Sequence, residues 1–146
     1  MCKKEEALSM FNGGLNCAQA VLASFADELG LDKEKALMIG SGFGAGMGRM
    51  ALTCGAVTGA LMVLGLKYGY TSGENRQAKD RSYGLIKDFI LEFSKQNGSI
   101  VCRDLLGCDV STPEGLVFAQ EKGLFHTLCP EYVRSSVAIL EEMLTR

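Results

Sequence analysis

Residues 54–67 constrain the fold most strongly, because they are apolar on every side and have the length of one helix. A helix on a protein surface carries a single apolar stripe, whereas a helix that is apolar all round is buried. Gly55 and Gly59 lie four residues apart. Ala56 and Ala60 share that spacing, so small residues leave one helix face nearly flat. The sequence therefore predicts a central helix that another helix approaches closely.

Glycines and capping residues divide the rest of the chain into pieces of helix length. No sustained alternation of apolar and polar residues predicts a strand. The predicted fold is all-α, a compact bundle of about six to seven helices around the central glycine- and alanine-rich helix, with residues 1–146 forming a single domain. Besides the central helix, we expect helices over residues 3–11, 17–29, 33–39, 74–96, 100–106, 113–123 and from 129 to the C-terminus.

Residues 40–48 form the most unusual stretch, with five glycines in nine residues. Such a stretch is either a loop or a helix end packed very close to its neighbours. A dinucleotide-binding loop would follow a strand and carry a G-x-G-x-x-G spacing, and a P-loop would end in Gly-Lys-Ser/Thr. The stretch follows a predicted helix and has neither pattern. We therefore expect no nucleotide cofactor.

Charge and hydropathy exclude several classes of partner. The formal net charge is −2, which gives no overall attraction to the phosphates of a nucleic acid. The longest apolar segment, residues 56–66, is too short to span a membrane as a helix. The first six residues contain no apolar stretch typical of a secretory signal. These features predict a cytoplasmic protein without a nucleic-acid or membrane partner.

The chain contains six cysteines, and four of them lie at the predicted starts of helices. A reducing cytoplasm argues against a disulfide framework. The free N–H groups and the partial positive charge of a helix start stabilise a thiolate, which is both a redox nucleophile and a ligand of soft metals. No C-x-x-C pattern is present, so the fold would have to assemble a shared site from distant segments. The four are Cys17, Cys54, Cys102 and Cys129.

Three further side chains are weaker candidates. Cys108 is separated from Cys102 by five residues and could form a local pair with it. His126 precedes Cys129 by three residues and is either a base or ligand of the same site or a surface residue. Cys2 lies close to the terminus and is expected to be incidental.

A combination of motifs resembles the C_GCAxxG_C_C family of redox-active proteins. The matching segments are the NCAQAV sequence of residues 16–21, the CGAVTGA sequence of residues 54–60, and the two later cysteines. The glycine-rich stretch also resembles the family's segment before the CGA motif. The resemblance covers nearly the whole chain and assigns four family cysteines, mapped by spacing to Cys17, Cys54, Cys102 and Cys129, with Cys108 competing for the third or fourth place.

The resemblance implies a redox role carried by the four family cysteines. A related domain occurs in multihaem split-Soret cytochromes, where an iron–sulfur site has been proposed beside the haems. This chain has no C-x-x-C-H motif, so no covalent haem is expected.

The leading hypothesis is that the four cysteines bind an iron–sulfur cluster or another soft metal for electron transfer or sensing. Gly55, Ala56 and Gly59 would border that cofactor, and backbone N–H groups around the first two would tune its potential. A redox protein would be the partner, and the flat helix face would allow a homodimer.

Two alternatives stay open. One is a thiol–disulfide oxidoreductase, in which two of the four cysteines cycle as catalytic residues. The other is a structural or partner-binding domain whose cysteines only pack. A cluster predicts four sulfurs converging on one point, disulfide cycling predicts close pairs, and packing predicts scattered, separately buried sulfurs.

Overall fold

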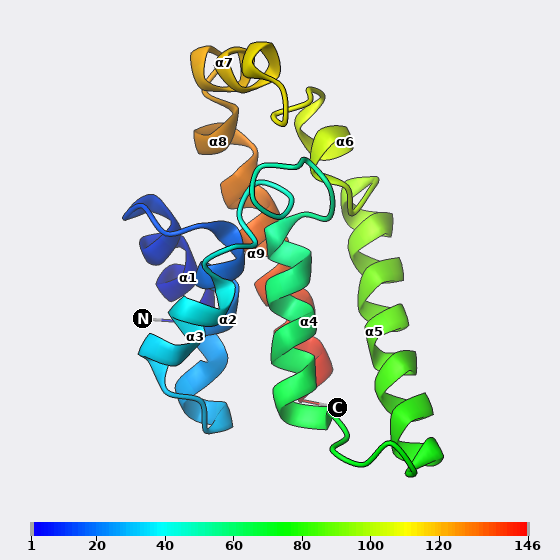
Figure 1. Cartoon of the computed structure of the whole chain (residues 1–146). Coiled ribbons are helices and arrows are strands. Elements are labelled where there is room, and N and C mark those ends of the chain that lie inside the picture. The colour runs from blue at the N-terminus through cyan, green and yellow to red at the C-terminus, as the bar shows by residue number, and fades with distance from the viewer. Residues whose placement is uncertain (1, 146) are drawn as a thin grey trace.

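The computed structural model describes residues 2–145 and confirms the all-α prediction. Within those residues there is no strand, and the only bridge pairs Thr53 with Val101. Figure 1 shows the arrangement of the helices. The described residues form α1 (Lys3–Asn12), α2 (Cys17–Ala26), the 3-10 helix η1 (Asp27–Leu29), α3 (Lys33–Gly40), α4 (Gly55–Tyr68), α5 (Arg76–Asn97), α6 (Cys102–Leu106), α7 (Pro113–Glu121), α8 (Leu124–Thr127) and α9 (Cys129–Leu144).

Helix α4 is the centre of the bundle, as its composition predicts. It packs against α2, α5 and α9 (Figure 1). Its Val57 and Val63 side chains are fully buried. A Cβ atom added to Gly59 would lie 2.7 Å from the carbonyl oxygen of Ala18, which is shorter than real Cβ contacts. The missing side chain therefore allows α2 to approach α4 as closely as the flat face predicts.

The structure differs from the expected boundaries at several helix ends. Helix α4 begins at Gly55 with Cys54 as its N-cap, whereas Thr53 was the expected cap. The reason is that the backbone around Thr53 is extended by its bridge to Val101, and the Cys54 N–H donates to the Ile100 carbonyl at 2.8 Å. The predicted helix over residues 17–29 ends in η1, and the short α8 was not expected.

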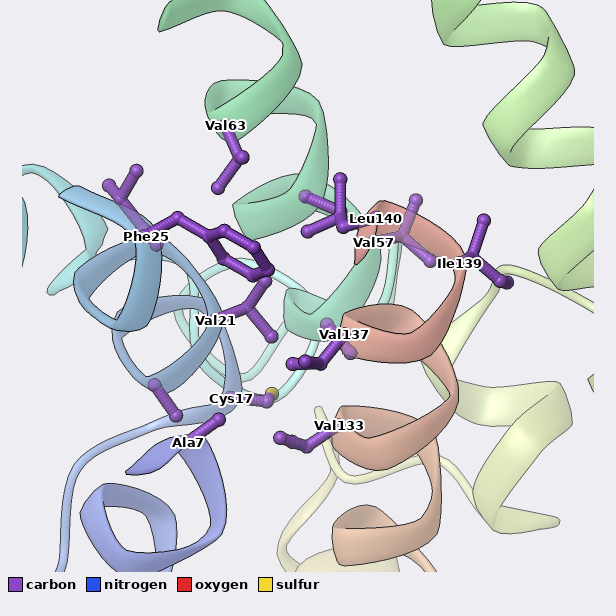
Figure 2. Close-up of a cluster of buried hydrophobic side chains, with 14 of the residues drawn as sticks. Ala7, Cys17, Val21, Phe25, Val57, Val63, Val133, Val137, Ile139 and Leu140 are labelled. Carbon is purple, nitrogen blue, oxygen red and sulfur yellow. The ribbon is translucent and has the colours of Figure 1, made fainter. Parts of the chain in front are cut away.

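The apolar core is divided into two clusters. The larger one fills the space between α2, α4, α5 and α9, and Figure 2 shows Val21, Phe25 and Val57 at its centre. The smaller one lies under α6 and α7 and contains Ala51, Cys102, Leu106, Val110 and Ala119. Two of the predicted site cysteines, Cys17 and Cys54, belong to the larger cluster, and Cys102 belongs to the smaller one. No helix within residues 2–145 is both long and apolar enough to cross a membrane.

Candidate functional site

A cavity of about 530 Å³ lies where the first turns of α2, α4, α6 and α9 meet. The segment between α3 and α4, residues 41–52, covers one side of it. All four cysteines predicted from the sequence border this cavity. The structure thus brings together thiols that are separated by up to 112 positions along the chain (129 − 17). The lining residues are Phe11, Asn16, Cys17, Ser41, Gly42, Gly44, Ala45, Gly46, Gly48, Arg49, Cys54, Gly55, Cys102, Leu105, Leu106, Leu116, Gln120, Phe125, Cys129 and Tyr132.

Each of these cysteines stands at the start of a helix, as predicted. Cys17, Cys102 and Cys129 are the first residues of α2, α6 and α9. Cys54 is the N-cap of α4. Three of these helices are ten residues or longer, so their free N–H groups and dipoles favour negative charge at the cavity.

Asn16 fixes the position of Cys17. Its side-chain oxygen accepts a hydrogen bond from the N–H of Gln19 at 2.8 Å, and the Gln19 side chain accepts one from the Asn16 N–H in return. This reciprocal capping box defines where α2 begins. The Asn16 amide nitrogen also donates to the carbonyls of Gly40 and Ser41 at 3.2 and 3.1 Å. One side chain therefore joins the start of α2 to the beginning of the covering segment.

Cys17 and Cys54 form a directly interacting pair. The Cys54 thiol donates a hydrogen bond to the Cys17 sulfur. Gly55 makes this contact sterically feasible, because a Cβ atom there would lie only 2.6 Å from the Cys17 sulfur. Figure 2 shows the Cys17 side chain at the edge of the large core cluster, near Val133 and Val137 of α9.

The pair carries an uneven distribution of charge. The hydrogen bond from Cys54 lowers the pKa of Cys17 from 9.0 to about 7, although burial opposes the shift. The N–H groups of Ala45, Cys17 and Ala18 lower it further. Donating that bond raises the pKa of Cys54 well above its usual range, and burial adds to the increase. As the pH rises through about 7, the pair therefore loses one proton, and the resulting negative charge is held mainly on Cys17.

The other two cavity thiols are held protonated. Burial raises the pKa of Cys102 and that of Cys129 to about 12. The charge on Cys17 contributes to both increases, which indicates that these sulfurs lie within electrostatic range of it. Above about pH 7 the cavity therefore contains one thiolate, Cys17, and three thiols.

The covering segment has a strained backbone. Ala45, Met47, Arg49 and Ala51 all have positive φ angles, of 50°, 69°, 64° and 58°. A left-handed conformation costs roughly 1–2 kcal/mol for each non-glycine residue, and such strain is concentrated at functional sites. The N–H of Ala45 donates to the Cys17 sulfur, so the strained backbone supplies one of the groups that stabilise the thiolate. The sequence predicts a loop here but not this run of left-handed residues.

Apart from the Cys17 thiolate, Arg49 is the one charged side chain among the described lining residues, and it is exposed at the rim. Together with the helix starts, it favours an anionic occupant.

The motif glycines and alanine have separate roles. Gly55 lines the cavity, and the N–H of Ala56 donates to the Cys54 sulfur. Gly59 lies one turn farther along α4 and packs against Ala18, outside the described cavity lining. The geometry of Gly59 is thus that of a helix-packing residue.

The weaker candidates lie outside the cavity lining. Cys108 is half-buried and packs against the small core cluster. His126 is exposed on α8, and Cys2 is exposed before α1. Sequence reasoning missed Tyr132, which lines the cavity and donates from its hydroxyl to the Leu105 carbonyl at 2.7 Å. Only its place in the first turn of α9, three residues after a site cysteine, could have drawn attention to it.

The donor set suits soft metals, but it is not a closed cage for one ion. Within residues 2–145, no group of three or more Cys, His, Asp or Glu side chains is arranged to hold a metal ion. A single tetrahedral zinc ion would need all its sulfurs at about 2.3 Å. The four thiols instead border a cavity much larger than one ion.

Comparison with protein families gives one match that covers most of the chain. The family model described as "Putative redox-active protein (C_GCAxxG_C_C)" matches residues 15–143. No curated protein and no solved structure matches the chain. The matched region contains the four cavity cysteines and the whole covering segment. The chain therefore belongs to the C_GCAxxG_C_C family of redox-active proteins.

Proposed function

We propose that the cavity is a redox centre in which Cys17, Cys54, Cys102 and Cys129 hold an iron–sulfur cluster. The observation that carries this proposal is the convergence of four thiols, from four helix starts, on one cavity of about 530 Å³. Separately packed cysteines would not be expected to share one cavity. A single ion would leave most of it empty, whereas a cluster spans sulfurs that are farther apart.

The electrostatics of the cavity support the same proposal. A cluster bound by four thiolates is anionic overall, and the lining offers helix starts and Arg49 with no carboxylate among its described residues. Backbone N–H groups already directed at sulfur, such as that of Ala56 at Cys54, would tune the reduction potential. When bound, the cluster would supply one-electron transfer.

The protonation states suggest how the chain's own residues would receive the metal. Cys17 is the first sulfur available as a thiolate, because its pKa of about 7 is the lowest of the four. The other three thiols lose their protons on binding, so uptake becomes more favourable as the pH rises. The electron donor or acceptor would be a redox protein of the cytoplasm, where reducing conditions keep the thiols free.

The test is to purify the protein without oxygen, record its absorption spectrum, and assay iron, sulfide and zinc. We expect visible absorption that dithionite bleaches, with stoichiometric iron and sulfide. Replacing any one cavity cysteine by serine should reduce the iron content, whereas Cys2→Ser should leave it unchanged. Zinc without sulfide, or a colourless protein without metal, would refute the cluster.

One observation favours a second function, thiol–disulfide exchange by Cys17 and Cys54. These two sulfurs are in hydrogen-bond contact, and one is a thiolate near neutral pH. The Cys17 thiolate would attack a substrate disulfide and release one thiol. The Cys54 sulfur, losing its proton, would then attack Cys17 and release the second thiol, so that the pair loses two electrons. A metal-free protein whose Cys17–Cys54 disulfide forms reversibly against a dithiol buffer would support this function.

A further inference from the structure

Cys108 is the one cysteine near the site that the proposed functions leave unused. It follows α6 directly, after Gly107, which has a φ of 72° and donates from its N–H to the Arg103 carbonyl at 2.9 Å. This left-handed cap ends the helix and turns the chain back across its own last turn. Cys108 consequently packs against the same small apolar cluster that contains Cys102.

Cys102 lies between the cavity and Cys108. Its side chain borders the cavity, yet it belongs to the small cluster beside α6 and α7 rather than to the large core. Cys102 is a buried member of this small cluster, and Cys108 packs against the same cluster from the residue after the α6 cap.

The two thiols differ in access from solvent. Cys102 is only 6% exposed, whereas Cys108 is half-buried and outside the described cavity lining. An oxidant arriving from solvent therefore meets Cys108 first. Only five residues separate the pair, so closing a ring between them costs little loop entropy.

We propose that Cys102 and Cys108 form a second dithiol that closes to a disulfide in response to a small-molecule disulfide of the glutathione class. The Cys108 sulfur, losing its proton, attacks that disulfide, forms a mixed disulfide and releases one thiol. The Cys102 sulfur, losing its proton, then attacks Cys108 and releases the second thiol. The two cysteines together lose two electrons and two protons, and the small disulfide is reduced to two thiols.

Closing this disulfide takes one sulfur away from the cavity. Only three of the four cavity thiols would then remain free, and a cofactor that needs four sulfur ligands could no longer bind with all of them. That consequence rests on the proposed function, whereas formation of the disulfide does not. Through Cys108, cofactor binding in the cavity would thus depend on the ratio of small-molecule disulfides to thiols in the surrounding solution.

The chain offers a direct test by peptide mapping. The metal-free protein is treated with glutathione disulfide at mildly alkaline pH, its remaining thiols are alkylated, and it is digested with trypsin without reduction. Cleavage after Lys95, Arg103 and Lys122 places Cys102 in peptide 96–103 and Cys108 in peptide 104–122. We expect a linked pair of these two peptides that dithiothreitol separates.

Two variants make the test specific. Cys108→Ser should abolish the linked pair and leave Cys102 alkylated, whereas Cys2→Ser, which removes an exposed cysteine outside the site, should leave the pair unchanged. Three results would overturn the proposal: an alkylated Cys102 in the treated wild-type protein, Cys102 linked to one of the other cavity cysteines, or Cys108 left as a stable glutathione adduct. None of these results bears on whether anaerobic protein contains iron.

Discussion

Replacing Gly55 by alanine tests whether close helix packing positions the Cys17–Cys54 pair. The added Cβ would lie 2.6 Å from the Cys17 sulfur, 3.0 Å from the Ala18 nitrogen and 3.1 Å from the Phe43 oxygen. The Ala18 nitrogen and the Phe43 oxygen are backbone atoms, and the sulfur belongs to the buried Cys17 side chain, which is 8% exposed. The two backbone atoms cannot move without the chain itself, and the Cys17 sulfur can move only by rotating away from its contact with Cys54. The start of α2 must therefore move away from α4.

The expected cost follows from two opposing effects. Overpacking a core by one methyl group costs about 1–3 kcal/mol. Alanine in place of glycine in a helix returns up to about 1 kcal/mol, and less at the first helical position. We expect a net loss of about 1–2 kcal/mol, which for a chain of this length lowers the melting temperature by roughly 3–8 °C. Separating the sulfurs also weakens the Cys54 hydrogen bond, so the pKa of Cys17 should rise above about 7.

Two measurements on reduced, metal-free protein check this expectation: thermal unfolding, and the pH dependence of alkylation of the Cys17-containing peptide. The matched control is Gly65→Ala on the same helix, where an added Cβ meets nothing within 4 Å. That variant should be slightly more stable than the wild type, with an unchanged alkylation profile. If Gly55→Ala behaves like Gly65→Ala in both assays, the packing argument is refuted.

Four further outcomes are expected. Asn16→Ala removes the cap of α2 and should cost about 1–2 kcal/mol in urea unfolding. Tyr132→Phe removes the bond to the Leu105 carbonyl and should cost about 1 kcal/mol, with faster alkylation of the α6 cysteine. Cys54→Ala should raise the pKa of Cys17 in alkylation profiles, whereas Cys54→Ser, which retains a donor, should raise it less. For reduced protein, stability should rise by about 1 kcal/mol between pH 7 and about 8.5, because the pKa of Cys17 is about 7 when folded and 9.0 ordinarily, while the other cavity thiols offset part of that gain as the pH approaches 9. Above pH 9 stability should fall, because the other three cavity thiols keep their protons in the folded state and lose them on unfolding; a flat profile would contradict both shifts.

The fold was predictable because its determinants are local. Capping residues such as Asn16 and Asp32 accept hydrogen bonds from the helix starts that the sequence indicated. Gly98 and Gly107 end their helices with positive φ angles, as helix-closing glycines do. The central place of α4 followed from its apolar composition. The helix boundary at Cys54 was wrong because a contact from a distant segment, the Ile100 carbonyl, set it.

The sequence predicted which cysteines border the cavity, but it did not predict their geometry. The position of a cysteine at a helix start is a local property, so the four candidates could be named from the sequence. Which two sulfurs touch depends on the crossing of α2 and α4, and that contact gives Cys17 its low pKa. The sequence also did not predict the left-handed run of residues 45–49. Alanine, methionine and arginine rarely adopt a positive φ, so their presence does not signal one.

The CGAxxG motif gains a physical explanation from these contacts. Gly59 lets α2 reach α4, Gly55 leaves room for the Cys17 sulfur, and the Ala56 N–H donates to the Cys54 sulfur. The motif therefore encodes an interhelical contact with one charge-stabilised sulfur, rather than a ligand-binding loop. It operates only with a cysteine at the start of α2, which explains why the earlier cysteine belongs to the pattern. The two later cysteines complete the cavity from α6 and α9, and the Tyr132 hydroxyl joins those helices through the Leu105 carbonyl. A variant that loosens either contact should thus alter the chemistry of all four sulfurs, since the pKa of each of the other three cavity thiols depends on the charge at Cys17.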